Sequence, residues 1–84
     1  MPNLLKLHEA IVVVLINREY RTATLNEITQ EITDRELYRQ QNGEGSFPPK
    51  SQIRLRTHPN TKAGKTYAHL FEFIEPDKVK LKSN

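Results

Sequence analysis

The chain has no cysteine, which excludes a disulfide framework and a zinc site built on thiolates. Long apolar runs are also absent, because the longest, Ala10 to Ile16, is far shorter than the roughly 20 residues that a membrane-spanning helix needs. The N-terminal segment has no cationic start followed by a small-residue cleavage site, so it shows no export signal. These absences predict a cytoplasmic protein that does not bind membranes.

Motifs of catalysis and cofactor binding are missing as well. The sequence contains no G-x-S-x-G motif and no glycine-rich phosphate loop. Pro76-Asp77 is not followed by the Glu-x-Lys that would complete a nuclease metal motif. The three histidines, His8, His58 and His69, lack the close spacing of a zinc site. We therefore expect a protein that is not an enzyme and needs neither a cofactor nor a metal ion.

The chain does have an uneven distribution of charge. Residues 1–49 carry five basic and seven acidic side chains, a net charge of −2, whereas residues 50–84 carry eight basic and three acidic side chains, a net charge of +5. A chain of 84 residues, 36% of them hydrophobic and 27% charged, predicts one small globular domain, residues 1–84. The charge division predicts that one part of this domain forms the scaffold while the other faces a polyanion, with DNA as the first candidate.

Apolar spacing predicts two helices in the acidic part. Apolar residues recur every three or four positions over residues 4–18, as on one buried helix face, with Asn3 as the N-cap. A strand is the alternative for the β-branched residues 11–14, but the stripe is longer than most strands. The capping box of residues 24–27 starts a second helix. A similar pattern at residues 33–36 either starts a further short helix with Leu37 and Tyr38 or continues the second helix with a kink, and we favour the kinked continuation.

The basic part predicts a short third helix and a hairpin. Residues 40–49 are rich in glycine, asparagine and proline and predict a loop, after which a helix over residues 49–57 places Ile53 in the core and Leu55 half-buried at best. Residues 59–65 predict a mobile polar loop, and residues 70–74 and 79–82 predict two strands joined by a turn at 75–78. We expect four aromatic residues to pack in the interior: Tyr20, Tyr38, Tyr67 and Phe71.

Three helices followed by a two-stranded hairpin is the winged helix-turn-helix plan, an α+β fold. The chain resembles the HARE-HTH family in five runs that span nearly its whole length: residues 8–11, 25–28, 37–39, 48–54 and 70–72. The resemblance implies binding of double-stranded DNA, with sensing of modified bases as one form, in bacterial restriction and modification or defence systems. It also implies a nuclease or methyltransferase domain or subunit as a partner, and a location at the nucleoid. The stretch from residue 57 to residue 67 is longer than the family pattern leads us to expect.

In a helix-turn-helix protein the second helix of the motif enters the major groove, so residues 49–57 are the predicted reading helix. Lys50, Arg54 and Thr57 follow at helical spacing and predict one DNA-facing side, flanked by Ser51, Gln52 and Arg56. Arg54 suits a bidentate contact to guanine and Gln52 one to adenine, and His58 could reach a phosphate. The structural alternative is that Arg54 or Arg56 pairs with an acid such as Glu36.

Two further groups of cations are candidates for backbone contacts. Strand alternation places Lys78, Lys80 and Lys82 on one face of the hairpin, with Val79 and Leu81 on the other. The alternative is that these lysines protect an exposed edge strand from aggregation. Lys62 and Lys65, in the polar loop, suit either phosphate contact or solubility.

Rival functions stay open at this point. A protein-docking winged helix would expose Phe47, Leu55 and Phe73 together as an apolar patch. RNA binding is a third hypothesis. The chain fits either a DNA-binding protein that acts alone or a module excised from a larger one. Monomer and weak dimer are both compatible with the first helix.

Overall fold

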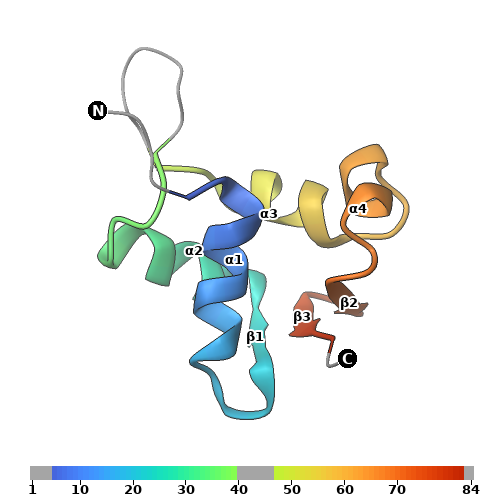
Figure 1. Ribbon diagram of the computed structural model, residues 1–84, viewed down its shortest axis with the longest axis horizontal. Coiled ribbons are helices and arrows are strands. Elements are labelled where there is room, and N and C mark those ends of the chain that lie inside the picture. The colour runs from blue at the N-terminus through green and yellow to red at the C-terminus, as the bar shows by residue number, and fades with distance from the viewer. Residues whose placement is uncertain (1–4, 40–46, 83–84) are drawn as a thin grey trace.

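The computed structural model of the chain describes residues 5–39 and 47–82. These residues form an α+β arrangement whose sheet is antiparallel and three-stranded, in the order β1-β3-β2. The elements are α1 (Leu7–Ile16), a 3₁₀ turn η1 (Glu19–Arg21), β1 (Thr22–Thr24), α2 (Leu25–Asp34), α3 (Lys50–Thr57), α4 (Lys62–Thr66), β2 (Phe71–Ile74) and β3 (Lys78–Leu81). In Figure 1 the turn between α1 and β1 lies at the bottom of the view, and α4 lies above the hairpin of β2 and β3. The arrangement is compatible with a winged-helix-like fold.

The predicted first helix is confirmed, over a shorter range. Its core face within α1 consists of Leu7, Ala10, Ile11, Val14 and Leu15, all buried. The predicted N-cap, Asn3, lies outside the described residues. At the described start of the helix, the backbone N–H of Lys6 donates to Glu9 Oε1 at 2.7 Å, so Glu9 satisfies an N–H group that precedes the first turn.

The capping box of the second helix is also confirmed. The backbone N–H of Glu27 donates to Thr24 Oγ1 at 3.1 Å, and that of Thr24 donates to Glu27 Oε1 at 2.8 Å. The bond from the Thr24 backbone holds the pKa of the Glu27 carboxyl below its usual value, with a smaller contribution from the Thr24 hydroxyl. Leu25, Ile28 and Ile32 form the predicted buried stripe.

The predicted kinked continuation of this helix is wrong, because α2 ends at Asp34. The backbone N–H of Leu37 donates to the Ile32 carbonyl (3.0 Å) and that of Glu36 to the Thr33 carbonyl (3.2 Å). These two bonds form a Schellman motif, in which the residue after the C-cap takes a left-handed conformation. Glu36 occupies that position with a φ of 50°, where glycine is the usual residue. Leu37 then packs against the core.

Replacing Glu36 with glycine should raise the free energy of unfolding by about 0.5 kcal/mol. Glycine avoids the roughly 1 kcal/mol that a side chain costs in the left-handed region, while the change removes an exposed ion pair to Arg39 (2.8 Å) that is worth a few tenths at most. Urea unfolding followed by circular dichroism measures the difference. As a control, Asn26→Gly, at an exposed site inside α2, should lower the free energy of unfolding. If Glu36→Gly lowers it as well, the Schellman motif at the end of α2 is assigned wrongly.

The predicted hairpin is confirmed, and the structure adds a strand to it. β2 and β3 pair antiparallel with Phe71 opposite Leu81, and β1 pairs with the other side of β3, with Ala23 opposite Val79. β3 is therefore the central strand of the sheet. The interpretation of its lysines as guards of an exposed edge is wrong, because both edges of β3 are hydrogen-bonded. The predicted alternation holds: Val79 and Leu81 are buried and Lys80 is exposed.

The predicted polar loop at residues 59–65 is partly wrong, because α4 begins inside it. Thr61 caps this helix: its Oγ1 accepts from the Gly64 N–H at 2.8 Å. The same hydroxyl lies against the carbonyl groups of Leu55 and His58 at the end of α3 and donates to one of them. Thr61 therefore joins α4 to α3, which explains the longer connection between the third helix and the hairpin.

Aromatic residues divide between the core and the surface. Phe71 is buried, and Tyr38 and Tyr67 pack against the core, as predicted. Tyr67 stacks on His8 with ring centroids 4.3 Å apart. The prediction for Tyr20 is wrong, because 81% of this residue is exposed. Within the described ranges, no helix is long and apolar enough to cross a membrane.

Candidate nucleic-acid interface

The third helix presents a short polar face to solvent. The predicted third helix is confirmed with a start one residue later, because Pro49 is the N-cap residue rather than part of the first turn, and Ile53 is fully buried as predicted. Lys50, Ser51 and Arg54 are exposed. Lys50 and Arg54 are one helical turn apart, so they lie on the same side, and that side is the predicted reading face.

Thr57 does not belong to this face, and its prediction as a DNA contact is corrected. The residue is 3% exposed, and its hydroxyl donates to the Ile53 carbonyl at 3.0 Å. Thr57 is four residues after the buried Ile53 and three after the exposed Arg54; at the end of the helix it follows Ile53 into the core. Its role is to satisfy the last turn of α3.

Gln52 and Arg56 bond to each other at the flank of the helix. Arg56 Nη1 donates to Gln52 Oε1 at 2.9 Å and approaches the Gln52 carbonyl at 3.3 Å, and both residues are half-buried. The predicted alternative of a pairing with Glu36 is wrong for Arg56, because Glu36 pairs with Arg39. A bidentate contact to adenine needs both amide atoms of glutamine, and here the oxygen already accepts from Arg56.

His58 is also buried, so its prediction as a phosphate contact is wrong. It is 6% exposed; its Nε2 lies 3.1 Å from Glu75 Oε1, and its Nδ1 accepts from the Asn60 N–H at 3.1 Å. Because Nδ1 accepts, the ring hydrogen is on Nε2 and is donated to Glu75. Neither ring nitrogen is left for a phosphate.

The residues around His58 connect the third helix to the hairpin. The His58 ring packs on Phe73 of β2 with ring centroids 4.6 Å apart. The Arg54 guanidinium also lies over the Phe73 ring, 5.9 Å from its centroid. Arg54 therefore stays exposed while it makes a weak contact with the Phe73 ring of the hairpin.

The predicted lysines of the loop and the hairpin are all exposed, and they come from two elements and the residue that follows the second. Lys62 and Lys65 belong to α4, Lys78 and Lys80 to β3, and Lys82 follows β3. On β3, Lys80 is opposite Thr22 of β1 and Glu72 of β2, and Lys78 is opposite Thr24 and Ile74. Lys78 and Lys80 therefore share the face of the sheet that lies opposite Val79 and the core.

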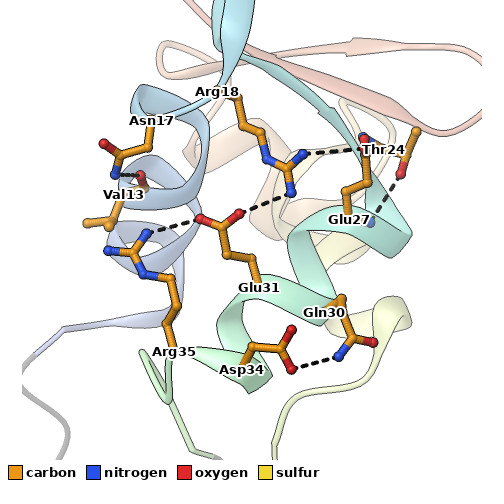
Figure 2. A network of polar contacts seen from close by, with 9 residues as sticks. All are labelled: Val13, Asn17, Arg18, Thr24, Glu27, Gln30, Glu31, Asp34 and Arg35. Carbon is orange, nitrogen blue, oxygen red and sulfur yellow. Dashed lines mark hydrogen bonds and ion pairs between the residues drawn. The ribbon is translucent and has the colours of Figure 1, made fainter.

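Glu27, Glu31 and Glu36 of the acidic part form ion pairs with arginines of the same part. Figure 2 shows Glu31 between two arginines: Arg18 Nη2 is 3.0 Å from its Oε1 and Arg35 Nη1 is 3.0 Å from its Oε2. Arg18 Nη1 also approaches Glu27 Oε2 at 3.4 Å. This network joins the end of α1 to α2, so these arginines are structural.

The basic part behaves differently. In residues 50–82, no lysine or arginine lies within ion-pair distance of a carboxylate of the described chain; the acid that is paired there, Glu75, pairs with His58. Cations without internal partners are available to an external anion. The positive charge of the C-terminal part is thus a property of the folded surface as well as of the sequence.

Sequence reasoning missed Arg21 as a candidate. It lies in the acidic part of the chain, where the charge division gives no reason to select it, yet it is exposed at the end of η1. Register places it beside the basic hairpin, because Thr22, the next residue, is opposite Lys80. The pairing of β1 with β3 brings it there, and β1 has no recognisable pattern in three residues.

No metal centre is evident in the part of the chain that the structure describes, where no three histidine, aspartate or glutamate side chains cluster. Comparisons of the whole chain with protein-family models, with curated proteins and with solved structures found no match.

Proposed function

We propose that this chain is a winged-helix domain that binds double-stranded DNA, with the exposed side of α3 in the major groove. The observation that carries the proposal is the set of exposed cations without internal ion pairs on α3, α4 and the hairpin. Lys50 and Arg54 are the reading residues. The lysines of α4 and β3, with Lys82, contact phosphates. Major-groove reading by a helix and backbone contact by flanking cations is the usual division of labour in such domains.

The resemblance to the HARE-HTH family supports a more specific form of this proposal. On that basis the domain reads DNA for a restriction, modification or defence system, and a nuclease or methyltransferase domain or subunit acts where it binds. Sensing of a modified base is part of the same proposal, and comparison of modified and unmodified duplexes tests it.

Protein docking is less well supported by the geometry. Of the three side chains that would form an apolar patch, Phe73 is half-buried against His58 and Arg54. Phe47 is half-buried with the Arg39 guanidinium 4.4 Å from its ring centroid. Leu55 is 42% exposed. A single exposed leucine is ordinary on a protein surface.

A salt titration tests the proposal directly. Fluorescence anisotropy of a labelled blunt duplex should give an affinity that falls steeply with salt, with a log–log slope of about −4 if four or five phosphates are neutralised at roughly −0.9 each. An A-form RNA duplex of the same sequence is the control, because its narrow major groove excludes a helix. A slope near zero, or equal affinity for RNA, would contradict duplex-DNA recognition by α3.

A further inference from the structure

The turn between α1 and β1 has an unusual backbone. Tyr20 has φ 57° and ψ 15°, and Arg21 has φ 52°, so two successive residues with side chains adopt the left-handed region. The Thr22 N–H donates to the Glu19 carbonyl and closes the turn. Such mirror-image turns usually contain asparagine and glycine, because other residues are strained there. We call residues 19–22 the Tyr20 turn.

Several bonds fix this conformation. The Arg21 N–H donates to the Arg18 carbonyl at 2.9 Å, and the Thr22 hydroxyl donates to the Tyr20 carbonyl at 2.8 Å. Arg18 itself is bound through its side chain to Glu27 and Glu31 of α2 (Figure 2). Strain that the surroundings enforce is concentrated at functional positions more often than elsewhere.

The strained turn displays an aromatic ring. Tyr20 is 81% exposed, the largest exposure among the exposed large hydrophobic residues of the described chain. Because the ring stays in water when the chain folds, its burial does not contribute to stability. A solvent-facing tyrosine on a backbone that hydrogen bonds hold in place is suited to stacking on a flat ligand, since only the two side-chain torsions of the ring have to be ordered when the ligand binds.

The surroundings of the ring are predominantly basic. Arg21 is exposed next to it, and the antiparallel pairing of Thr22 with Lys80 directs the turn towards the end of β3, where Lys82 follows. The acids nearby are Glu19, within the turn, and Glu72, opposite Lys80. An aromatic face beside three cations is the combination that proteins use for nucleic-acid strands: the ring stacks on a base and the cations contact its phosphates.

We infer that Tyr20 is a stacking platform for an unpaired base of the nucleic acid that the domain binds, at a duplex end or a junction with a single strand. The base must be unpaired because both faces of a base within a duplex are covered by its neighbours. The inference rests on the proposed function and adds a substrate class to it. The domain measures 33 × 27 × 23 Å, so no axis of it is longer than one turn of duplex, about 34 Å, and its size is compatible with contacts of α3 and the Tyr20 turn to one substrate.

The test compares a blunt duplex with the same duplex carrying a single-stranded overhang of about six nucleotides, by anisotropy at fixed salt. The native chain should bind the overhang substrate about tenfold more tightly, the effect expected of one stacked base. Tyr20→Ala should abolish this preference and leave the affinity for the blunt duplex unchanged, whereas Tyr20→Phe should retain the preference. Ile16→Ala, which truncates another exposed side chain (55% exposed) that cannot stack, is the matched control and should also retain it.

The outcomes separate the two proposals. Equal affinity of the native chain for both substrates overturns the stacking role and leaves duplex binding intact. A preference that survives Tyr20→Ala overturns the stacking role too, because the overhang is then bound elsewhere. Binding of the isolated strand, lost in Tyr20→Ala, together with no binding of the blunt duplex, supports the stacking role and overturns the proposed duplex reading. Failure to bind any of these substrates overturns both.

Discussion

Replacing Gly64 with alanine should destabilise the domain by about 3 kcal/mol, near the upper end of the usual cost of overpacking. A Cβ atom at this position would lie 1.8 Å from the His58 carbonyl oxygen and 2.6 Å from Thr61 Oγ1. The first distance is far inside van der Waals contact and involves backbone, which cannot turn away as a side chain can. For a domain of this size the loss corresponds to a fall of roughly 12–24 °C in the melting temperature.

The sign of this effect is what makes it informative. Gly64 belongs to α4, and helix propensity alone predicts that alanine stabilises a helix by up to about 1 kcal/mol relative to glycine. Only the close approach of α4 to the end of α3 reverses that expectation. The His58 carbonyl cannot retreat freely, because the Thr61 N–H donates to it at 3.2 Å.

Thermal unfolding followed by circular dichroism measures the change. Lys65→Ala, at an exposed site in the same helix, is the matched control and should shift the melting temperature by only a few degrees. An alanine at position 64 that leaves the melting temperature unchanged or raises it would show that α4 does not pack on α3 as described.

The sequence predicts the features that are formed by residues close together in the chain. The capping box of Thr24 and Glu27 involves residues three apart, and the alternation of Val79 and Leu81 with lysines repeats every second residue, so both are visible in the sequence. The burial of Ile53 can also be predicted locally, because the short third helix has few other apolar residues to place in the core.

The missed features depend on partners distant in sequence. β1 is only three residues long and exists because Ala23 pairs with Val79. α4 contains a glycine and follows a proline and an asparagine, which predict a loop until the contacts of Thr61 with α3 are known. His58 is buried at the hairpin, where its ring packs on Phe73 and its Nε2 contacts Glu75, seventeen residues away. The conformation of Tyr20 has no sequence signal, since its residue type is unsuited to the left-handed region.

Some residues of the candidate site can likewise be predicted from local sequence, and others cannot. Exposure of Lys50, Arg54 and the lysines follows from charge and periodicity, and the structure confirms it. The spacing from Lys50 and Arg54 predicts an exposed Thr57, and the position beside the third helix predicts an exposed His58. Both are buried, because the end of α3 packs against α4 and β2. DNA binding itself stays a prediction that these positions make testable.

The largest effect on binding is expected from removing the two cations of the reading face. The double variant Lys50→Gln and Arg54→Gln should lower the affinity for duplex DNA by roughly 100-fold at physiological salt, since a bidentate arginine contact is worth about 1–3 kcal/mol and a lysine contact adds a phosphate or base interaction. Both side chains are exposed and neither forms an ion pair within the described residues. The fold should therefore be retained, apart from the weak contact of Arg54 with the Phe73 ring.

Charge alone has to be separated from position in this experiment. Lys6→Glu changes the net charge by the same two units at an exposed site of the acidic part, and it should lower the affinity less than threefold, because it removes only a general attraction, which salt screens, and no proposed contact to the DNA. The salt slope should become less steep by about one to two units in the double variant and stay unchanged in the control. Equal losses in the two proteins would mean that the duplex responds to net charge only, and the assignment of α3 as the reading helix would be wrong.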